Sequence, residues 1–312
     1  MSWLRVFRPA SPKILYCEGM TDVSLGEFIT RHPRLFVLTG AGCSTASGIP
    51  DYRDDNGDWK RARPVMLQSF LASELTRQRY WARSLVGWHR MSTARPNGAH
   101  LALAKLERLG RVEALVTQNV DGLHQAAGSR NVIDLHGRID VVRCMGCEQR
   151  WPRAHVQAEL VRRNPRFADL DALAAPDGDA DLDGIDFAAF DVPACTACGG
   201  VMKPDVVFFG ENVPKERAGL AMEALSQSDA MLVVGSSLMV LSGYRFARAA
   251  AETGKPIAAV NLGRTRADDL LAFKLTAPCA DALSFLLRQD DSMPPAAAAP
   301  RSWLEWPLEE RP

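Results

Sequence analysis

The chain has 312 residues, and its 37 lysine and arginine residues balance 37 aspartate and glutamate residues, so its formal net charge is zero. This balance argues against a protein that holds nucleic acid by bulk electrostatics, because such domains carry a basic excess or a basic stripe. The apolar share of 47% and the charged share of 24% are typical of a globular protein and exclude a disordered one.

The sequence predicts neither a membrane span nor a secretion signal. No stretch approaches the roughly 18 uninterrupted apolar residues that a membrane helix needs. Residues 1–15 contain Arg5, Arg8 and Lys13 but no apolar core, unlike a signal peptide. We expect a cytoplasmic protein, with the mitochondrial matrix as the alternative. We also expect a monomer that contacts neither a membrane nor, directly, nucleic acid.

Short apolar runs, most of them rich in β-branched residues, recur along the chain and predict buried parallel strands. They lie at residues 35–38, 114–116, 132–135, 231–234 and 257–260. Helical patterns lie between them, at residues 101–109, 215–226 and 244–253. Strands that alternate with helices favour the α/β class with a Rossmann-like, doubly wound parallel sheet.

Two segments interrupt this alternation. We predict a helical module at residues 55–96, which are rich in arginine and tryptophan, and a zinc-binding insertion at residues 143–203. The remainder would form a discontinuous Rossmann-like domain, from residues 1–54, 97–142 and 204–292. Residues 293–312, rich in alanine and proline, are expected to form a weakly ordered tail.

A glycine loop follows the first predicted strand. Gly40-Ala41-Gly42 would let the backbone turn tightly and approach a pyrophosphate, which the amides of the next helix would meet. The dehydrogenase fingerprint G-x-G-x-x-G needs a glycine where this chain has Thr45. The loop is therefore a dinucleotide site of another geometry or only a tight turn. The polar residues that follow, more than a plain turn needs, are Ser44, Ser47, Asp51 and Arg53.

Polar residues also follow the next two predicted strands. Gln118, Asn119 and Asp121 stand where open α/β sheets place a ligand crevice. His136 follows the strand at residues 132–135, and the near-neutral pKa of a histidine suits a general base. Most lone histidines are structural, so we assign that role to three others and leave two undecided between structure and function. The structural ones are His32, His89 and His155; the undecided ones are His100 and His124.

Four of the seven cysteines form two C-x-x-C pairs, Cys144 with Cys147 and Cys195 with Cys198. Each pair lets one turn offer two thiolates to an ion, and two such turns complete a tetrahedral site. Four protein ligands leave no open position, so the predicted zinc is structural. The alternative, two redox pairs, is disfavoured because a thioredoxin-type motif would open a helix after a strand.

Six motifs together resemble the sirtuins, a family of NAD-dependent protein-lysine deacylases. They lie at residues 40–53, 117–121, 135–137, 203–211, 235–238 and 261–263, and the resemblance spans roughly residues 28–287. Within the family the chain is most similar to class II. Three features carry that likeness: residues 79–83, the long acidic insertion before Cys195, and residues 242–246.

The resemblance implies a reaction and a set of residues for it. In sirtuins the acyl-lysine carbonyl oxygen attacks the nicotinamide ribose carbon, nicotinamide leaves, and the acyl group passes to ADP-ribose. His136 would be the general base, with Asn119 and Asp121 as the other catalytic residues. The implied NAD contacts are Gly40, Ala41, Gly42, Ser44, Ile49, Pro50, Asp51, Tyr52, Arg53, Gln118, Asn119, Val120, Asp121, Gly235, Ser236, Ser237, Asn261, Leu262, Gly263 and Cys279.

The resemblance also implies where an acyl-lysine protein or peptide substrate binds. The peptide would add as a strand at Phe209, Gly210 and Glu211, with Val207 and Phe209 along the acyl-lysine tunnel. Tyr80 and Arg83 share a helix face, and in that family the pair would hold the carboxylate of an acidic acyl group.

Several alternatives stay open at this point. The helix that carries Tyr80 and Arg83 is otherwise read as a basic surface helix. The alternative functions are a mono-ADP-ribosyltransferase that uses the same NAD pocket and a non-catalytic NAD-binding regulator.

Overall fold

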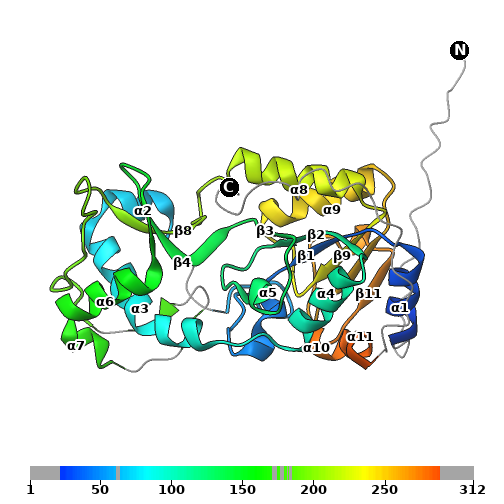
Figure 1. The fold of residues 1–312 in the computed structure, drawn as a ribbon, viewed down its shortest axis with the longest axis horizontal. Helices are drawn as coiled ribbons and strands as arrows, with labels where there is room; N and C mark the ends of the chain where they lie inside the picture. Colours follow the sequence, from blue (N-terminus) through cyan, green and yellow to red (C-terminus); the bar gives the residue numbers. More distant parts are fainter. Residues whose placement is uncertain are drawn as a thin grey trace, which may run out of the picture.

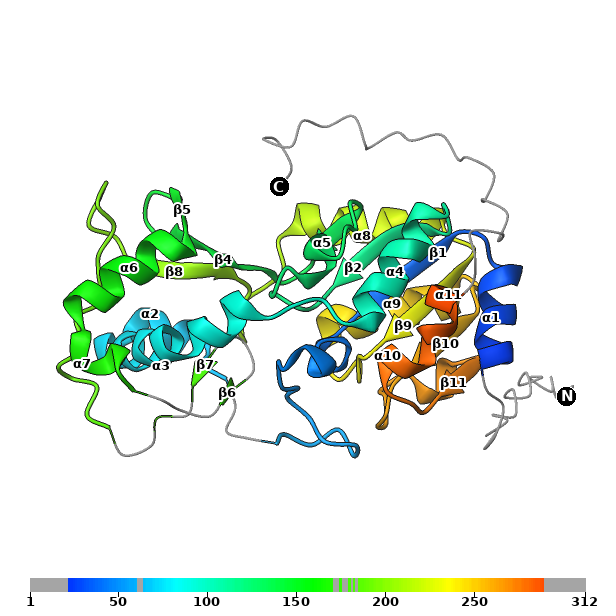
Figure 2. The same ribbon diagram turned by 60° about the horizontal axis from the view of Figure 1, so that its bottom comes forward.

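The computed structural model describes residues 22–60, 64–170, 174–175, 179–180, 182 and 185–288. A larger body built on a six-stranded sheet and a smaller body built on a three-stranded sheet lie side by side along the long axis (Figures 1 and 2). The predicted tail at residues 293–312 lies outside the described residues.

The larger sheet is parallel throughout and has the strand order β3-β2-β1-β9-β10-β11. All five predicted strands are present, with ends within two residues of their predicted positions, and β11 is a further strand at the edge. The bounds are β1 Leu35–Thr39, β2 Val112–Thr117, β3 Val132–Asp134, β9 Ala230–Val234, β10 Ile257–Val260 and β11 Phe273–Leu275.

Helices cover both faces of this sheet, which is why its central strands are apolar without alternation. Every residue of β1, β9 and β10 is buried. Leu35 and Val37 pack with one helical layer, and Phe36 and Leu38 with the other. The first layer has α1 (Asp22–Arg31), α4 (Gly98–Arg108), α10 (Cys279–Ala282) and α11 (Ser284–Arg288); the second has α8 (Lys215–Gln227) and α9 (Leu241–Glu252).

The strand order reverses between β1 and β9. From β1 the chain proceeds to β2 and β3 on one side, and it later returns to β9, β10 and β11 on the other. At such a switch point the loops after the two central strands diverge and leave a crevice beyond the carboxyl ends of the strands. The fold therefore predicts a ligand site next to Thr39 and Val234, the last residues of β1 and β9.

The smaller body is an antiparallel sheet of order β5-β4-β8 with helices packed against it. Phe70 and Trp81 lie fully buried in its core. Its elements are β4 (Gly137–Cys144), β5 (Arg150–Pro152), β8 (Met202–Val206), α2 (Leu67–Ala72), α3 (Glu74–Thr93), α6 (Arg153–Arg163) and α7 (Pro165–Ala168). The predicted domain boundaries at 142/143 and 203/204 fall inside β4 and β8, and the domain ranges stay a prediction.

The remaining elements are short. The strands β6 and β7 form a two-stranded antiparallel sheet. The bounds are β6 Ala174–Ala175, β7 Asp179–Ala180, α5 Leu123–Ala126, η1 Ala41–Cys43, η2 Thr45–Ser47 and η4 Asp268–Leu270. Across the part of the chain that the structure describes, no helix is long and apolar enough to cross a membrane.

Candidate functional site

The loops after β1 and β9 touch each other backbone to backbone at the switch point. The Gly42 amide donates to the Gly235 carbonyl at 2.8 Å, and the Gly40 amide donates to Val234 at 3.1 Å. A Cβ on Gly40 would lie 2.8 Å from that of Ser236, and one on Gly235, at φ +65°, would lie 2.2 Å from a backbone nitrogen. Side chains are excluded here by the close approach of the two loops, a stricter requirement than a tight turn.

The segment after β2 closes the same crevice from the side. The side-chain amide of Asn119 donates to the Gly40 carbonyl at 3.1 Å and to the Ser44 hydroxyl at 3.0 Å. The Gln118 side-chain oxygen accepts from the Ser236 hydroxyl at 2.6 Å. Three predicted motifs, from separate parts of the chain, therefore meet through direct hydrogen bonds.

Ser44 is the centre of a small polar network. Its hydroxyl donates to Asp121 Oδ2 at 2.7 Å and lies 3.4 Å from His100 Nε2. His100 Nδ1 accepts from the Asn97 amide at 3.2 Å in the capping box that begins α4. Burial lowers the pKa of His100, and the Asp121 carboxylate partly opposes the shift. His100 thus combines helix capping with support of the crevice wall.

His124 contacts the end of β1 where that strand is hydrogen-bonded to the end of β2. The Thr39 hydroxyl donates to Thr117 at 2.8 Å, so it accepts from His124 Nε2 at 2.9 Å. Burial lowers the pKa of His124 to about 3, and the neighbouring His100 adds to the shift. The imidazole is therefore neutral near pH 7. Its position under the sheet ends indicates a structural role.

His136 stands at the crevice with a fixed tautomer. A carbonyl only accepts, so His136 Nδ1 carries the proton that it donates to the Gln118 carbonyl at 3.0 Å. Nε2 therefore carries the lone pair, and this lone pair accepts a hydrogen bond from the Ser242 hydroxyl at 2.8 Å. Burial lowers the pKa of His136 to about 4, with smaller contributions from the positive charges of Arg217 and Arg245. A neutral imidazole with the lone pair on Nε2 can act as a base.

The segment from Val207 to Glu211 lies directly beside His136. The Val207 amide donates to the His136 carbonyl at 2.7 Å. Val207 and Phe209 are partly exposed whereas Phe208 between them is buried, so the two share the accessible side. The Phe209 carbonyl already accepts from the Leu67 amide at 2.9 Å, and that of Gly210 accepts from Gln68 at 3.0 Å.

A buried ion pair holds the turn of this segment. Lys203 is fully buried, and its ammonium group lies 3.0 Å from Glu211 Oε2. The same carboxylate oxygen accepts from the Phe208 amide at 2.9 Å. The carboxylate of Glu211, predicted from the resemblance to bind substrate, is thus engaged within the protein. Loss of the Glu211 charge would leave the fully buried Lys203 ammonium without its ion-pair partner, which costs roughly 3–5 kcal/mol.

The segment that continues the glycine loop is held by side-chain contacts on its far side. Asp51 pairs with Lys60 at 2.6 Å, and the Arg53 guanidinium lies 4.0 Å above the Trp59 ring. Tyr52 meets that ring edge-on. Ile49, which precedes these residues in the loop, packs against the core of the smaller body. Pro50 between these residues is partly buried.

The last predicted NAD contacts lie beyond β10. Asn261 donates to the Gly263 carbonyl at 2.8 Å, and Leu262 between them is 54% exposed. Cys279 is buried where α10 begins, with its sulfur 3.9 Å from the Val260 carbonyl. The Gly235 amide also bonds to Val260, at 2.8 Å, which links this group to the central crevice. The other predicted contacts in the neighbouring loops, Ala41, Val120 and Ser237, are partly buried.

Tyr80 and Arg83 lie on α3, away from the glycine loops. Tyr80 is 8% exposed and packs against the rings of Phe70, Trp81 and Phe208. Arg83, three residues further on, is half-buried. Because Phe208 belongs to the segment beside His136, the aromatic cluster connects α3 to the predicted substrate strand. Tyr80 is therefore a core residue of the smaller body, which a basic surface helix would not require.

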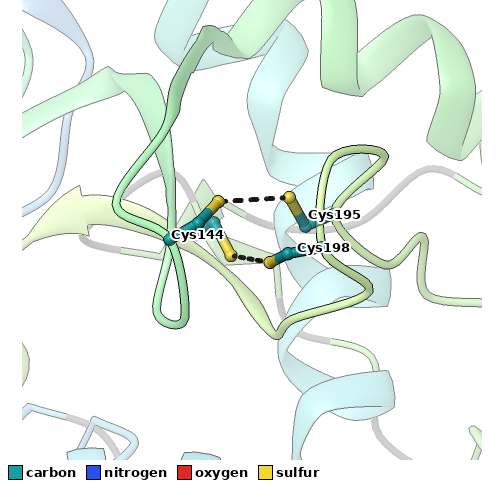
Figure 3. A group of neighbouring side chains, drawn as sticks. Cys144, Cys195 and Cys198 are labelled. Carbon is teal, nitrogen blue, oxygen red and sulfur yellow. Dashed lines mark hydrogen bonds between the residues drawn. The ribbon is translucent and has the colours of Figure 1, made fainter.

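The two C-x-x-C pairs converge, as Figure 3 shows for the labelled Cys144, Cys195 and Cys198. The sulfur atoms of these three residues and of Cys147, the fourth cysteine, all lie within 4.8 Å of one another. The Cys144–Cys198 and Cys147–Cys195 sulfur distances are 3.5 and 3.7 Å. A tetrahedral ion with Zn–S bonds of about 2.3 Å places its sulfurs about 3.8 Å apart. The donor set and its spacing fit one structural zinc.

Comparison with known proteins places this geometry in a family. Residues 40–242 match the Sir2 family model. A relative from Xanthomonas campestris pv. campestris, called an NAD-dependent protein deacetylase, is 65% identical over 278 residues, which cover 89% of this chain and 95% of the relative. NAD-dependent protein deacetylase 2 of Bradyrhizobium diazoefficiens is 63% identical, with 86% and 98% covered.

Solved structures agree with these relatives. One described as "Sir2-p53 peptide-NAD+" is similar with a TM-score of 0.68 and 30% identity, covering 86% of this chain and 97% of its own. A Sir2 homologue in complex with NAD is similar with a TM-score of 0.66 and 31% identity, covering 86% and 93%. The likeness extends over both bodies of the molecule.

Proposed function

This chain belongs to the Sir2 family, and we propose on that premise that it is an NAD-dependent protein-lysine deacylase. It transfers the acyl group of an acyl-lysine to ADP-ribose and releases nicotinamide. One observation carries the proposal: Gly40, Asn119, Asp121 and His136 converge at the switch point of the sheet. That convergence brings a bare backbone cradle, polar side chains and a neutral imidazole into one crevice.

The cradle suits the phosphates of NAD. Gly40, Gly42 and Gly235 let two loops approach each other without side chains at the carboxyl ends of adjacent parallel strands, where α/β folds bind dinucleotides. Asn119 and Gln118 hold the nicotinamide ribose, and Asp121 accepts from the nicotinamide amide. Asn261 and the backbone at Cys279 contact the adenosine end. The remaining NAD contacts are those implied by the family motifs.

His136 is the general base. Its Nδ1–H bond to Gln118 leaves the lone pair on Nε2, where the Ser242 hydroxyl gives way to a ribose hydroxyl whose proton the imidazole takes. The low pKa keeps the imidazole neutral throughout the physiological range. The reaction thus needs no prior deprotonation of this residue, and Asn119 and Asp121 orient the NAD that it acts on.

The peptide lies along Val207, Phe209, Gly210 and Glu211, with the acyl-lysine directed toward His136. Tyr80 and Arg83 set a preference for acidic acyl groups, which we propose because their helix packs against Phe208 in this segment. Zinc, when bound by the four cysteines, supplies a cross-link between β4 and the segment before β8 and no open coordination position.

The monomeric state, the cytoplasmic location and the absence of nucleic-acid contacts are part of the proposal. Two close C-x-x-C pairs support a reducing compartment, because metal ligation requires their thiols unoxidised.

Incubation with NAD and a panel of acyl-lysine peptides tests the function directly. We expect nicotinamide release that depends on an acylated peptide, with acetyl-, succinyl- and glutaryl-lysine compared by mass spectrometry. Peptides with unmodified lysine serve as the control. No release with any acyl group would reject the deacylase. ADP-ribose retained on a protein acceptor would favour the transferase, and NAD binding without turnover would favour the regulator.

Ser242 provides a second test, because no sequence pattern pairs it with His136. Its hydroxyl donates to the neutral form of the imidazole, so removing it should raise the pKa of His136. The acid limb of kcat/KM, which reports the free enzyme, should move upward by about one pH unit in Ser242→Ala. Ser242→Thr keeps the hydroxyl and should restore the wild-type profile. An unchanged limb in Ser242→Ala would contradict this contact.

A further inference from the structure

A pocket of about 230 Å³ lies on the outer side of the predicted substrate strand. Val206, Val207 and Pro214 supply its apolar wall, and its charged lining consists of Arg143, Arg150 and Arg217 with Asp205, Glu211 and Glu216. Figure 1 shows the chain passing from β8 in the smaller body to α8 in the larger one, and Val206, Val207 and Pro214 of the pocket lining belong to this passage. The pocket therefore lies at the junction of the two bodies, beside the reacting site.

Two of these three arginines lie within ion-pair distance of carboxylates. Arg150 pairs with Asp205 at 2.8 Å, and Arg143 lies 3.6 Å from the same carboxylate. Arg143 also lies 3.8 Å from Glu211, whose other oxygen is held by Lys203. Both carboxylates therefore have their full complement of cations and have little remaining capacity for a further one.

Arg217 is different. Among the residues that the structure describes, its half-buried guanidinium makes no hydrogen bond and no ion pair. Burial lowers the pKa of Arg217, and the attraction of Asp205 and Asp134 only partly opposes this. Glu216, which also lines the pocket, is exposed and adjacent to Arg217 on a helix, where successive side chains diverge. A partly desolvated guanidinium without a partner is a binding group for a planar anion.

The position of Arg217 connects this anion site to the substrate. The pocket shares Val207 and Glu211 with the predicted peptide-binding segment. The Val207 amide bonds to His136, and the charge of Arg217 acts on the same imidazole. A peptide laid along this segment would pass the pocket mouth within a few residues of its acyl-lysine, because a strand advances about 3.3 Å per residue.

We propose that Arg217 and this pocket bind the carboxylate of an acidic side chain that flanks the acyl-lysine in the protein substrate. This rests on the proposed function and adds a sequence preference to it. Strand addition through main-chain bonds alone selects little for sequence, whereas a bidentate arginine–carboxylate contact discriminates glutamate from glutamine. The enzyme would thus select lysines in acidic surroundings.

Peptide binding measures the pocket separately from turnover. Fluorescent acyl-lysine peptides with glutamate or glutamine scanned along the flanking positions would be titrated against the full-length protein, and the ratio of the two Kd values recorded. We expect roughly tenfold tighter binding of one glutamate peptide to the wild type, and a ratio near one in Arg217→Gln. The ratio compares two peptides on one variant, so a general loss of affinity does not affect it.

Two control variants sharpen the test. Arg248→Gln removes an exposed arginine on α9, paired with Glu252, and should keep the wild-type ratio. Glu216→Gln removes a negative charge at the pocket and should increase the ratio. Equal Kd values for every wild-type pair, or a preference retained in Arg217→Gln, would overturn the inference. Competition by inorganic phosphate without any preference between peptides would indicate a free-anion site and would also overturn it. A clear preference without nicotinamide release would reject the proposed reaction and keep the pocket.

Discussion

Replacing His136 by alanine should lower nicotinamide-coupled deacylation by about 10³-fold, because a positioned general base contributes on the order of 10²–10⁴-fold. NAD affinity should change little. The Gln118 carbonyl loses its bond from His136 Nδ1, but the side chains of Gln118 and Asn119 stay held by Ser236, Gly40 and Ser44. Single-turnover kinetics would measure the loss, and isothermal titration calorimetry would measure NAD binding.

The matched control is His89→Ala, which removes an exposed histidine from α3 and should leave turnover unchanged. Circular dichroism would establish that both variants fold. An unfolded His136→Ala protein would assign the residue a structural role, and turnover within tenfold of the wild type would exclude it as the base.

Loss of one zinc ligand should have the second large effect. Cys198→Ala should lower the zinc content from about one ion per chain to near zero after dialysis against a weak chelator. Structural four-cysteine zinc sites bind with about 10–16 kcal/mol in small peptides, so the smaller body should lose several kcal/mol of stability. Cys198 is exposed, so the change removes a ligand without opening a core cavity.

Cys279→Ala is the matched control, because it removes a buried thiol outside the cluster and should retain full zinc. Atomic emission would give the metal content, and hydrogen exchange would report each body separately. We expect faster exchange in β4 and β8, with β1 and β9 still protected. Full zinc retention by Cys198→Ala would contradict the four-cysteine site, as would a disulfide between the pairs in the wild type.

The sequence predicted the features that local patterns encode. Continuous apolar runs located five strands of the larger sheet, because strands buried on both faces carry no polar alternation. Gly40, Asn119 and His136 follow three of these strands. They lie at one edge of the sheet because parallel strands end on the same side. The cysteine spacing likewise predicted the convergence of Cys144 with Cys195, since each pair is a local turn.

Contacts between segments that are distant in the chain could not be predicted from the sequence. β11 is three residues long, pairs on one side only and has no fully buried residue, so its pattern is weak. The partner of His136, Ser242, is contributed by a helix that follows a different strand. No spacing rule links the two residues, and only the packing of α9 across the sheet brings them together.

The same limit applies to residues whose pattern was ambiguous. His100 and His124 look alike in the sequence, as histidines in polar motifs. Their roles depend on the Asn97 amide and the Thr39 hydroxyl, which only the folded chain presents. Tyr80 is predicted from the resemblance to bind substrate with Arg83, with a basic surface helix as the alternative, and neither interpretation predicts that its ring lies in an aromatic core.

The two strands that lead to the zinc cluster, β4 and β8, have their other ends beside His136, the proposed base. β4 starts at Gly137, the residue after His136, and β8 ends at Val206, the residue before the Val207 amide that bonds to the His136 carbonyl. A reagent that strips the metal would therefore displace the base without entering either substrate pocket. Its inhibition would be noncompetitive toward both NAD and peptide, and resupplied zinc would reverse it, unlike a ligand of the crevice.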